Sequence, residues 1–145
     1  MHKSLGVDWE DVLVVFTDNA AHWYLRFLKR GFRHCFVVLG NGQEWVLLEH
    51  LFSSTEISLI KFFTKEELRN IFISKGHIVI EGSFFPRPVS ARKIGIFTCV
   101  ESIKRVLGIK SMNLATPYQL YKFLKKEKNR KKSVDIGINS CYSDF

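Results

Sequence analysis

Short apolar runs alternate with glycine, proline and polar residues along the chain. Residues 12–17 are apolar and β-branched, which is typical of a buried strand. Residues 33–39 and 44–49 form two further runs that flank Gly40-Asn41-Gly42-Gln43. An Asn-Gly pair between two such runs predicts a β-hairpin with a type I′ turn, in which both central residues have positive φ. Two more strands are expected at residues 57–62 and 77–81.

Three hydroxyl residues mark the predicted starts of helices, each with Glu or Gln three positions later. They are Thr64 before Glu67, Thr98 before Glu101, and Thr116 before Gln119, and all three have the sequence of a capping box. Gly76 and Gly108 are suitable stops for the first two helices. The third helix has Pro117 at its first position, where the missing N–H has no cost.

The predicted order is strand, linker, hairpin, strand, helix, strand and two helices. Strands followed by late helices predict an α+β fold. The linker, residues 20–30, has mixed helical and loop character, and a proline-containing loop is expected at 82–92. We predict a single domain over residues 1–124 and a basic, flexible C-terminal tail over 125–145.

Composition narrows the possible classes of protein. The chain has 145 residues, of which 46% are hydrophobic and 25% charged, so extensive disorder is excluded. No apolar run approaches the roughly 20 residues of a membrane helix, and the N-terminus lacks the pattern of a secretory signal. A cytoplasmic protein is therefore expected, with its three cysteines present as thiols.

Positive charge is concentrated near the C-terminus. Seven cations and one acid lie between Lys122 and Lys132, so +6 of the net charge of +8 falls in this stretch. Residues 125–132 have no apolar side chain to bury, and we expect the last helix to lose its packing near Leu124. The tail is then either a solvated charged end or a weak binding site for an anionic partner.

The hairpin places two titratable residues together. A turn centred on Asn41-Gly42 sets His34 directly opposite Glu49, and cross-strand partners share one face of the sheet. A carboxylate beside an imidazole fixes the tautomer of a general base and stabilises its cation.

Cys99 is the predicted nucleophile. With Thr98 as N-cap, it is the first residue of a helix, where free N–H groups and the helix dipole stabilise a thiolate. Cys35 alternates onto the face away from His34, and Cys141 falls in the tail, so neither is assigned a role.

Each of these residues also has an ordinary structural interpretation. His34 is equally suited to a satisfied structural histidine, Glu49 to an exposed strand end, and Cys99 to a helix start without chemistry. The combination of all three favours a catalytic site. No cofactor is expected, and no pair of Cys or His has the spacing of a metal site.

The order of these residues resembles a known group of enzymes. A His on one strand, an acid on the next and a Cys that opens a later helix are similar to the circularly permuted papain-like group, which is related to the NlpC/P60 cysteine peptidases. Phe97 to Ile109 and Thr116 to Tyr121 resemble small bacterial and phage proteins. The resemblance covers residues 11–124, although Thr98-Cys99-Val100 replaces the Asp-Cys-Ser of ordinary NlpC/P60 domains.

This resemblance implies an antiparallel sheet packed on helices, with Cys99 as nucleophile, His34 as base and Glu49 as the orienting acid. The expected activity is hydrolysis of an amide bond through an acyl-enzyme, with peptidoglycan-type peptide as the substrate class. Acyl transfer to lipid or another amide stays open. The rival hypothesis is a non-catalytic binding or phage structural protein on the same fold, and association with a virion or export by a partner also stays open.

Overall fold

A computed structural model describes residues 9–20, 22–82, 98–111 and 113–140, with side chains as far as residue 131. The elements, in chain order, are β1 (Asp11–Thr17), the 3₁₀-helix η1 (Trp23–Phe27), β2 (His34–Gly40), β3 (Glu44–His50), β4 (Thr55–Lys61), α1 (Lys65–Ser74), β5 (Ile78–Gly82), α2 (Cys99–Val106) and α3 (Pro117–Ser140). The α+β class is confirmed, and the predicted strands and helices are present. The predicted loop at 82–92 lies almost entirely outside the described residues, and Cys141 lies outside them.

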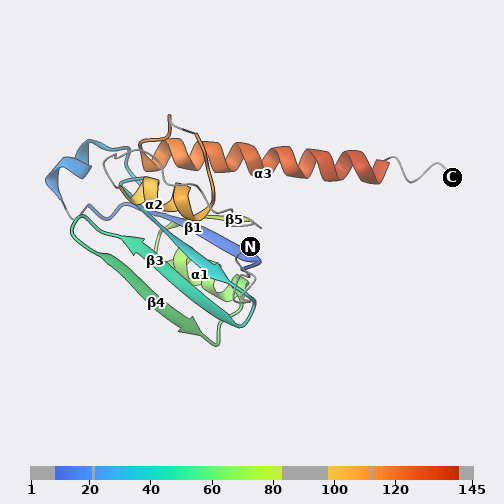
Figure 1. Cartoon of the computed structure of the whole chain (residues 1–145), viewed down its shortest axis with the longest axis horizontal. Coiled ribbons are helices and arrows are strands. Elements are labelled where there is room, and N and C mark those ends of the chain that lie inside the picture. The colour runs from blue at the N-terminus through green and yellow to red at the C-terminus, as the bar shows by residue number, and fades with distance from the viewer. Residues whose placement is uncertain (1–8, 21, 83–97, 112, 141–145) are drawn as a thin grey trace, which may run out of the picture.

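The strands form one antiparallel sheet in the order β4-β3-β2-β1-β5. The helix α1 covers one face of the sheet, while α2 and α3 cover the other (Figure 1). Because both faces are covered, the interior strand β1 is apolar almost throughout, and its residues 12–16 are fully buried.

Each face has its own hydrophobic core. On the α1 side, Leu68 and Phe72 pack over Phe36 and Trp45. The other core joins α2 and α3 to the alternate strand positions, and its buried members are Val12, Val14, Phe16, Phe32, Cys35, Val37, Ile80, Val100, Ile103, Leu107, Leu120 and Leu124. The helix α2 therefore packs on the face of the sheet to which Cys35 points.

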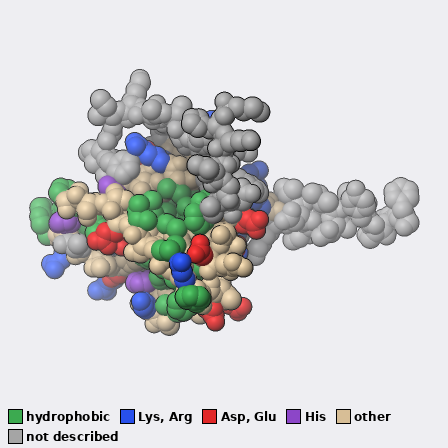
Figure 2. Space-filling view, turned by 60° about the horizontal axis from the view of Figure 1, so that its bottom comes forward, with side chains coloured by type: hydrophobic (Ala, Val, Ile, Leu, Met, Phe, Trp, Pro, Cys, Tyr) green, Lys and Arg blue, Asp and Glu red, His purple; other side chains and the backbone are tan. Residues whose placement is uncertain are grey.

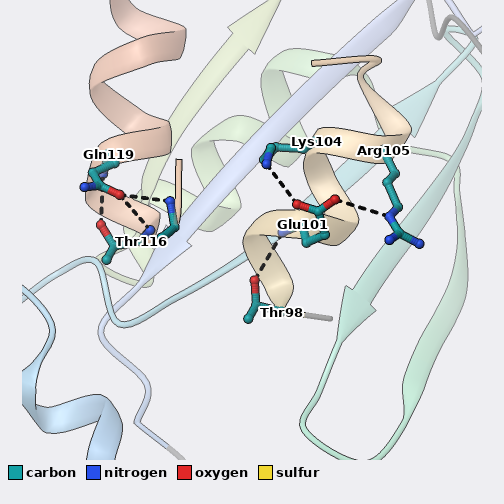
Figure 3. A network of polar contacts seen from close by, with 7 residues as sticks. Thr98, Glu101, Lys104, Arg105, Thr116 and Gln119 are labelled. Carbon is teal, nitrogen blue, oxygen red and sulfur yellow. Dashed lines mark hydrogen bonds and ion pairs between the residues drawn. The ribbon is translucent and has the colours of Figure 1, made fainter. Parts of the chain in front are cut away.

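The helix starts follow the predicted capping chemistry, with one correction. Thr64 and Glu67 form a complete capping box, and Gln119 accepts hydrogen bonds from the backbone N–H groups of Thr116 and Ala115. At α2 only half of the box is present. The Thr98 hydroxyl accepts from the backbone N–H of Glu101, but the Glu101 carboxylate binds Lys104 and Arg105 instead of the N-cap (Figure 3).

The C-terminal helix α3 continues as one helix through the basic stretch (Figure 1). Leu124 is its last buried residue among those whose side chains are described. Beyond it, Lys128 lies 3.7 Å from Glu81 of β5 and is half-buried. Beyond Leu124 the described side chains of α3 are exposed or half-buried, and the flexible tail expected over 125–145 stays a prediction. None of the helices in the described part of the chain is both long enough and apolar enough to span a bilayer.

Candidate active site

The predicted register of the β2–β3 hairpin is wrong by two residues. Gly40 pairs with Trp45 and Val37 with Leu48, so the central turn residues are Gly42 and Gln43 instead of Asn41 and Gly42. Only Gly42 has positive φ in this turn, at 90°, so the turn is not type I′. The Asn41 side-chain oxygen accepts hydrogen bonds from the backbone N–H groups of Gln43 and Glu44, which stabilises the turn in this position.

Despite this error, His34 and Glu49 are in contact. A shift of two residues preserves the parity of the strands, so both side chains remain on one face. The His34 Nε2 and a Glu49 carboxylate oxygen lie 2.8 Å apart. The side chains are 13% and 26% exposed, so the contact is partly shielded from water. The predicted direct opposition is wrong, because the observed register sets Glu49 level with Phe36, and the β2–β3 ladder itself ends at Val37 and Leu48.

The hairpin is forked at this end. Beyond Leu48, β3 stays paired with β4 through His50, while β2 stays paired with β1 back to His34. The N-terminal end of α2 lies at this fork, since its first residue, Cys99, interacts with His34 and Cys35 at the start of β2. Thr98 caps the helix, which places Cys99 at its first position (Figure 3).

Cys99 interacts with both neighbouring residues at the start of β2. Hydrogen bonding from the Cys35 thiol, together with the hydrogen bond and positive charge of His34, lowers the pKa of Cys99 from 9.0 to about 4. The backbone N–H of Cys35 adds a further hydrogen bond, and these interactions outweigh the opposing effect of burial. Cys99 is therefore a thiolate at neutral pH.

The pKa of His34 moves in the opposite direction. Burial disfavours the imidazolium, but the Cys99 thiolate and then the Glu49 carboxylate favour it more strongly, so the pKa of His34 is raised above 6.5. Since Nε2 is bound to Glu49, Nδ1 is the ring nitrogen left for Cys99. The three residues form a thiolate–imidazolium pair that is supported by a carboxylate.

Cys35 is the member of this site that the sequence interpretation missed. Its thiol is fully buried, and burial followed by the interaction with Cys99 raises its pKa well above 9.0. It stays protonated and donates to the Cys99 thiolate. No sequence signal could have found it, because only the fold shows that α2 covers this face: Val100, which follows Cys99, packs in the same core as Cys35 and Val37.

The described residues include no group of three Cys, His, Asp or Glu side chains arranged to hold a metal ion. What they bring together is a thiol with a lowered pKa, an imidazole with a raised pKa, and a carboxylate in contact with that imidazole. No protein-family model, curated protein or solved structure matches this chain.

Proposed function

We propose that the protein is a thiol hydrolase that cleaves an amide bond through an acyl-enzyme on Cys99. The observation that carries this proposal is the pairing of a Cys99 pKa of about 4 with a raised pKa of His34. Between these two values both groups are charged, so the nucleophile is already deprotonated and the proton needed by the leaving group is already on His34.

The first half of the reaction forms a thioester. The Cys99 sulfur attacks the carbonyl carbon of the amide, and the carbonyl oxygen becomes an oxyanion for which the backbone N–H of Cys99 is the first donor. Collapse of this intermediate breaks the carbon–nitrogen bond, and His34 gives its proton to the departing amine. Glu49 holds the imidazole through Nε2 during this transfer.

The second half regenerates the enzyme. Neutral His34 takes a proton from water, the oxygen adds to the thioester, and the carboxylic acid leaves as the Cys99 thiolate re-forms. The imidazolium that results is the partner with which the cycle began. An acceptor other than water would give acyl transfer by the same steps.

Family resemblance supports the class of substrate. A circularly permuted papain-like fold is the finer architecture that we propose, because the chain orders the His strand, the acid strand and the Cys helix in that way on an antiparallel sheet. Peptidoglycan-type peptide is the amide that this resemblance favours.

Acylation of Cys99 tests the proposal without knowledge of the natural substrate. We expect p-nitrophenyl acetate to give a burst of nitrophenol, with an acetyl group on Cys99 detected by mass spectrometry and then lost by hydrolysis. Replacement of His34 by Ala should slow both phases, and Cys99→Ala should abolish the burst. A wild-type protein that shows no burst, and whose Cys99 reacts as an ordinary thiol, would support the non-catalytic rival.

A further inference from the structure

A cluster of exposed aromatic side chains lies at one end of the molecule. Its members, which we call the aromatic tip, are His22, Trp23, Tyr24, Phe27 and Phe52. Trp23 is 73% exposed, Phe27 83% and Phe52 77%, and the rings contact one another. Burial would favour each ring by about 1.5–3 kcal/mol, so this much exposure contributes little to folding and points to a binding surface.

The base of the tip is fixed to the domain. Phe32 is buried between Phe16 and two tyrosines of α3, and Lys29 lies 3.6 Å above the ring of Tyr118. The backbone N–H of Gly31 donates to Asp18. Because these contacts hold the segment, its outer rings project from a well-packed base. Figure 2 shows hydrophobic and histidine side chains at the left end of the molecule, where η1 lies in Figure 1.

The same segment is positively charged. Residues 22–33 include Arg26, Lys29, Arg30 and Arg33 and no acidic residue. Asp18 lies 3.5 Å from Arg33, whereas Arg26 and Arg30 are exposed beside the aromatic rings. Projecting Trp, Tyr and Phe rings together with Arg and Lys match the interface of an anionic bilayer, where rings enter the headgroup region and cations meet phosphate.

We propose that the aromatic tip docks the protein peripherally on an anionic lipid bilayer. A site for single-stranded nucleic acid would instead set its rings along a charged groove, and rings that are three-quarters exposed line no such groove. Six residues, 28–33, join Phe27 of the tip to His34, and Phe52 follows shortly after the end of β3. Docking therefore turns the end of the sheet that carries the candidate active site toward the membrane. Membrane binding itself does not depend on the proposed catalysis.

Vesicle co-sedimentation of the full chain tests this proposal. We expect binding to vesicles of an equimolar mixture of phosphatidylcholine and phosphatidylglycerol, weaker binding to phosphatidylcholine alone, and a loss of the difference as salt is raised. The double variant Trp23→Ser/Phe27→Ser should lower the partition coefficient by roughly tenfold or more. The matched control is Ile57→Ser/Leu59→Ser, which removes apolar residues that are 68% and 58% exposed on β4 and should bind as the wild type does.

Charge reversal separates the tip from the basic part of α3. Arg26→Glu/Arg30→Glu should weaken binding to the anionic vesicles more than Lys125→Glu/Lys126→Glu does. Circular dichroism confirms that each variant is folded. The proposal is overturned if the folded wild type binds neither kind of vesicle, if only the α3 variant loses binding, or if the control double variant loses as much as the tip variant.

Discussion

The two ends of the β2–β3 hairpin are built in opposite ways. At the turn end the ladder is closed, and the buried ring of Trp45 covers Gly40 so tightly that an added Cβ would lie 2.2 Å from it. At the other end the ladder opens before His34, and polar side chains occupy the fork instead of backbone hydrogen bonds. The closed end fixes the fold, and the open end leaves its groups available for chemistry.

The turn end also has a hollow of its own. A hollow of about 430 Å³ lies at the turn end, lined by residues 42–44 and 61–64, and none of these is a Cys or His. The thiolate and imidazolium lie at the fork. The perturbed pKa values of Cys99 and His34 are what direct attention to the fork.

Truncation at the closed end should have the largest effect, and on stability alone. Trp45→Ala removes a fully buried ring and its hydrogen bond to the Phe63 carbonyl, and should lower the free energy of unfolding by about 3–5 kcal/mol. Urea denaturation measures this. Trp45→Phe should recover most of the lost packing energy, and alkylation of Cys99 in either folded variant should match the wild type. A change in thiol reactivity would contradict the separation of the two ends.

Removal of the base should have the next largest effect, this time on reactivity. His34→Ala deletes the positive charge beside Cys99, and such a charge shifts a pKa by about 1–3 units. The rate of Cys99 alkylation at about pH 5 should fall by up to roughly 100-fold, because the thiolate fraction falls. Mass spectrometry of iodoacetamide-treated protein gives the rate at each cysteine. His77→Ala is the matched control, since His77 does not contribute to the Cys99 pKa.

Cys35 should have a smaller effect of the same sign. Cys35→Ala removes the thiol that donates to the Cys99 thiolate, and one hydrogen bond contributes about 0.5–1.5 kcal/mol. We expect the pKa of Cys99 to rise by up to about one unit, which slows its alkylation at about pH 5 by up to about twofold. Cys35→Ser keeps a donor and should lie closer to the wild type. Equal rates in both variants would show that the Cys35 thiol does not stabilise the thiolate.

Glu49→Gln should have the smallest effect, and only on the alkaline side of the pH–rate profile. The hydrogen bond and charge of Glu49 help to raise the pKa of His34, so their loss lowers that pKa. Acylation turnover should then decline at lower pH than in the wild type, because His34 loses its proton earlier. The acid limb of the pH–rate profile, which is set by the pKa of Cys99, should not move. An alkaline limb of the pH–rate profile that is unchanged in Glu49→Gln would contradict a role of Glu49 in the site.

Local signals predicted the elements well, and long-range contacts less well. Thr64, Thr98 and Thr116 mark their helix starts because capping is chemistry between neighbours in sequence. The turn register escaped prediction because both Asn41-Gly42 and Gly42-Gln43 are acceptable centres, and the Asn41 side chain decides between them.

The candidate site shows the same limit. The contact between His34 and Glu49 could be predicted because parity survives a two-residue shift. The role of Cys35 could not be predicted, because it depends on which face of the sheet α2 covers. No local sequence pattern near Cys99 indicates that face. Alternation along β2 correctly separated Cys35 from His34, yet Cys99 lies at the fork and reaches both.

The pH dependence of Cys99 alkylation tests the central claim most directly. In the full-length wild type, the rate at Cys99 should rise through a midpoint near the pKa of about 4 and then stay level across neutral pH, because the thiolate is already formed. Cys35 should stay unreactive over the same range, since its pKa is raised. A Cys99 rate that instead rises only near the ordinary thiol value of 9.0 would contradict the thiolate–imidazolium pair and the hydrolase mechanism built on it.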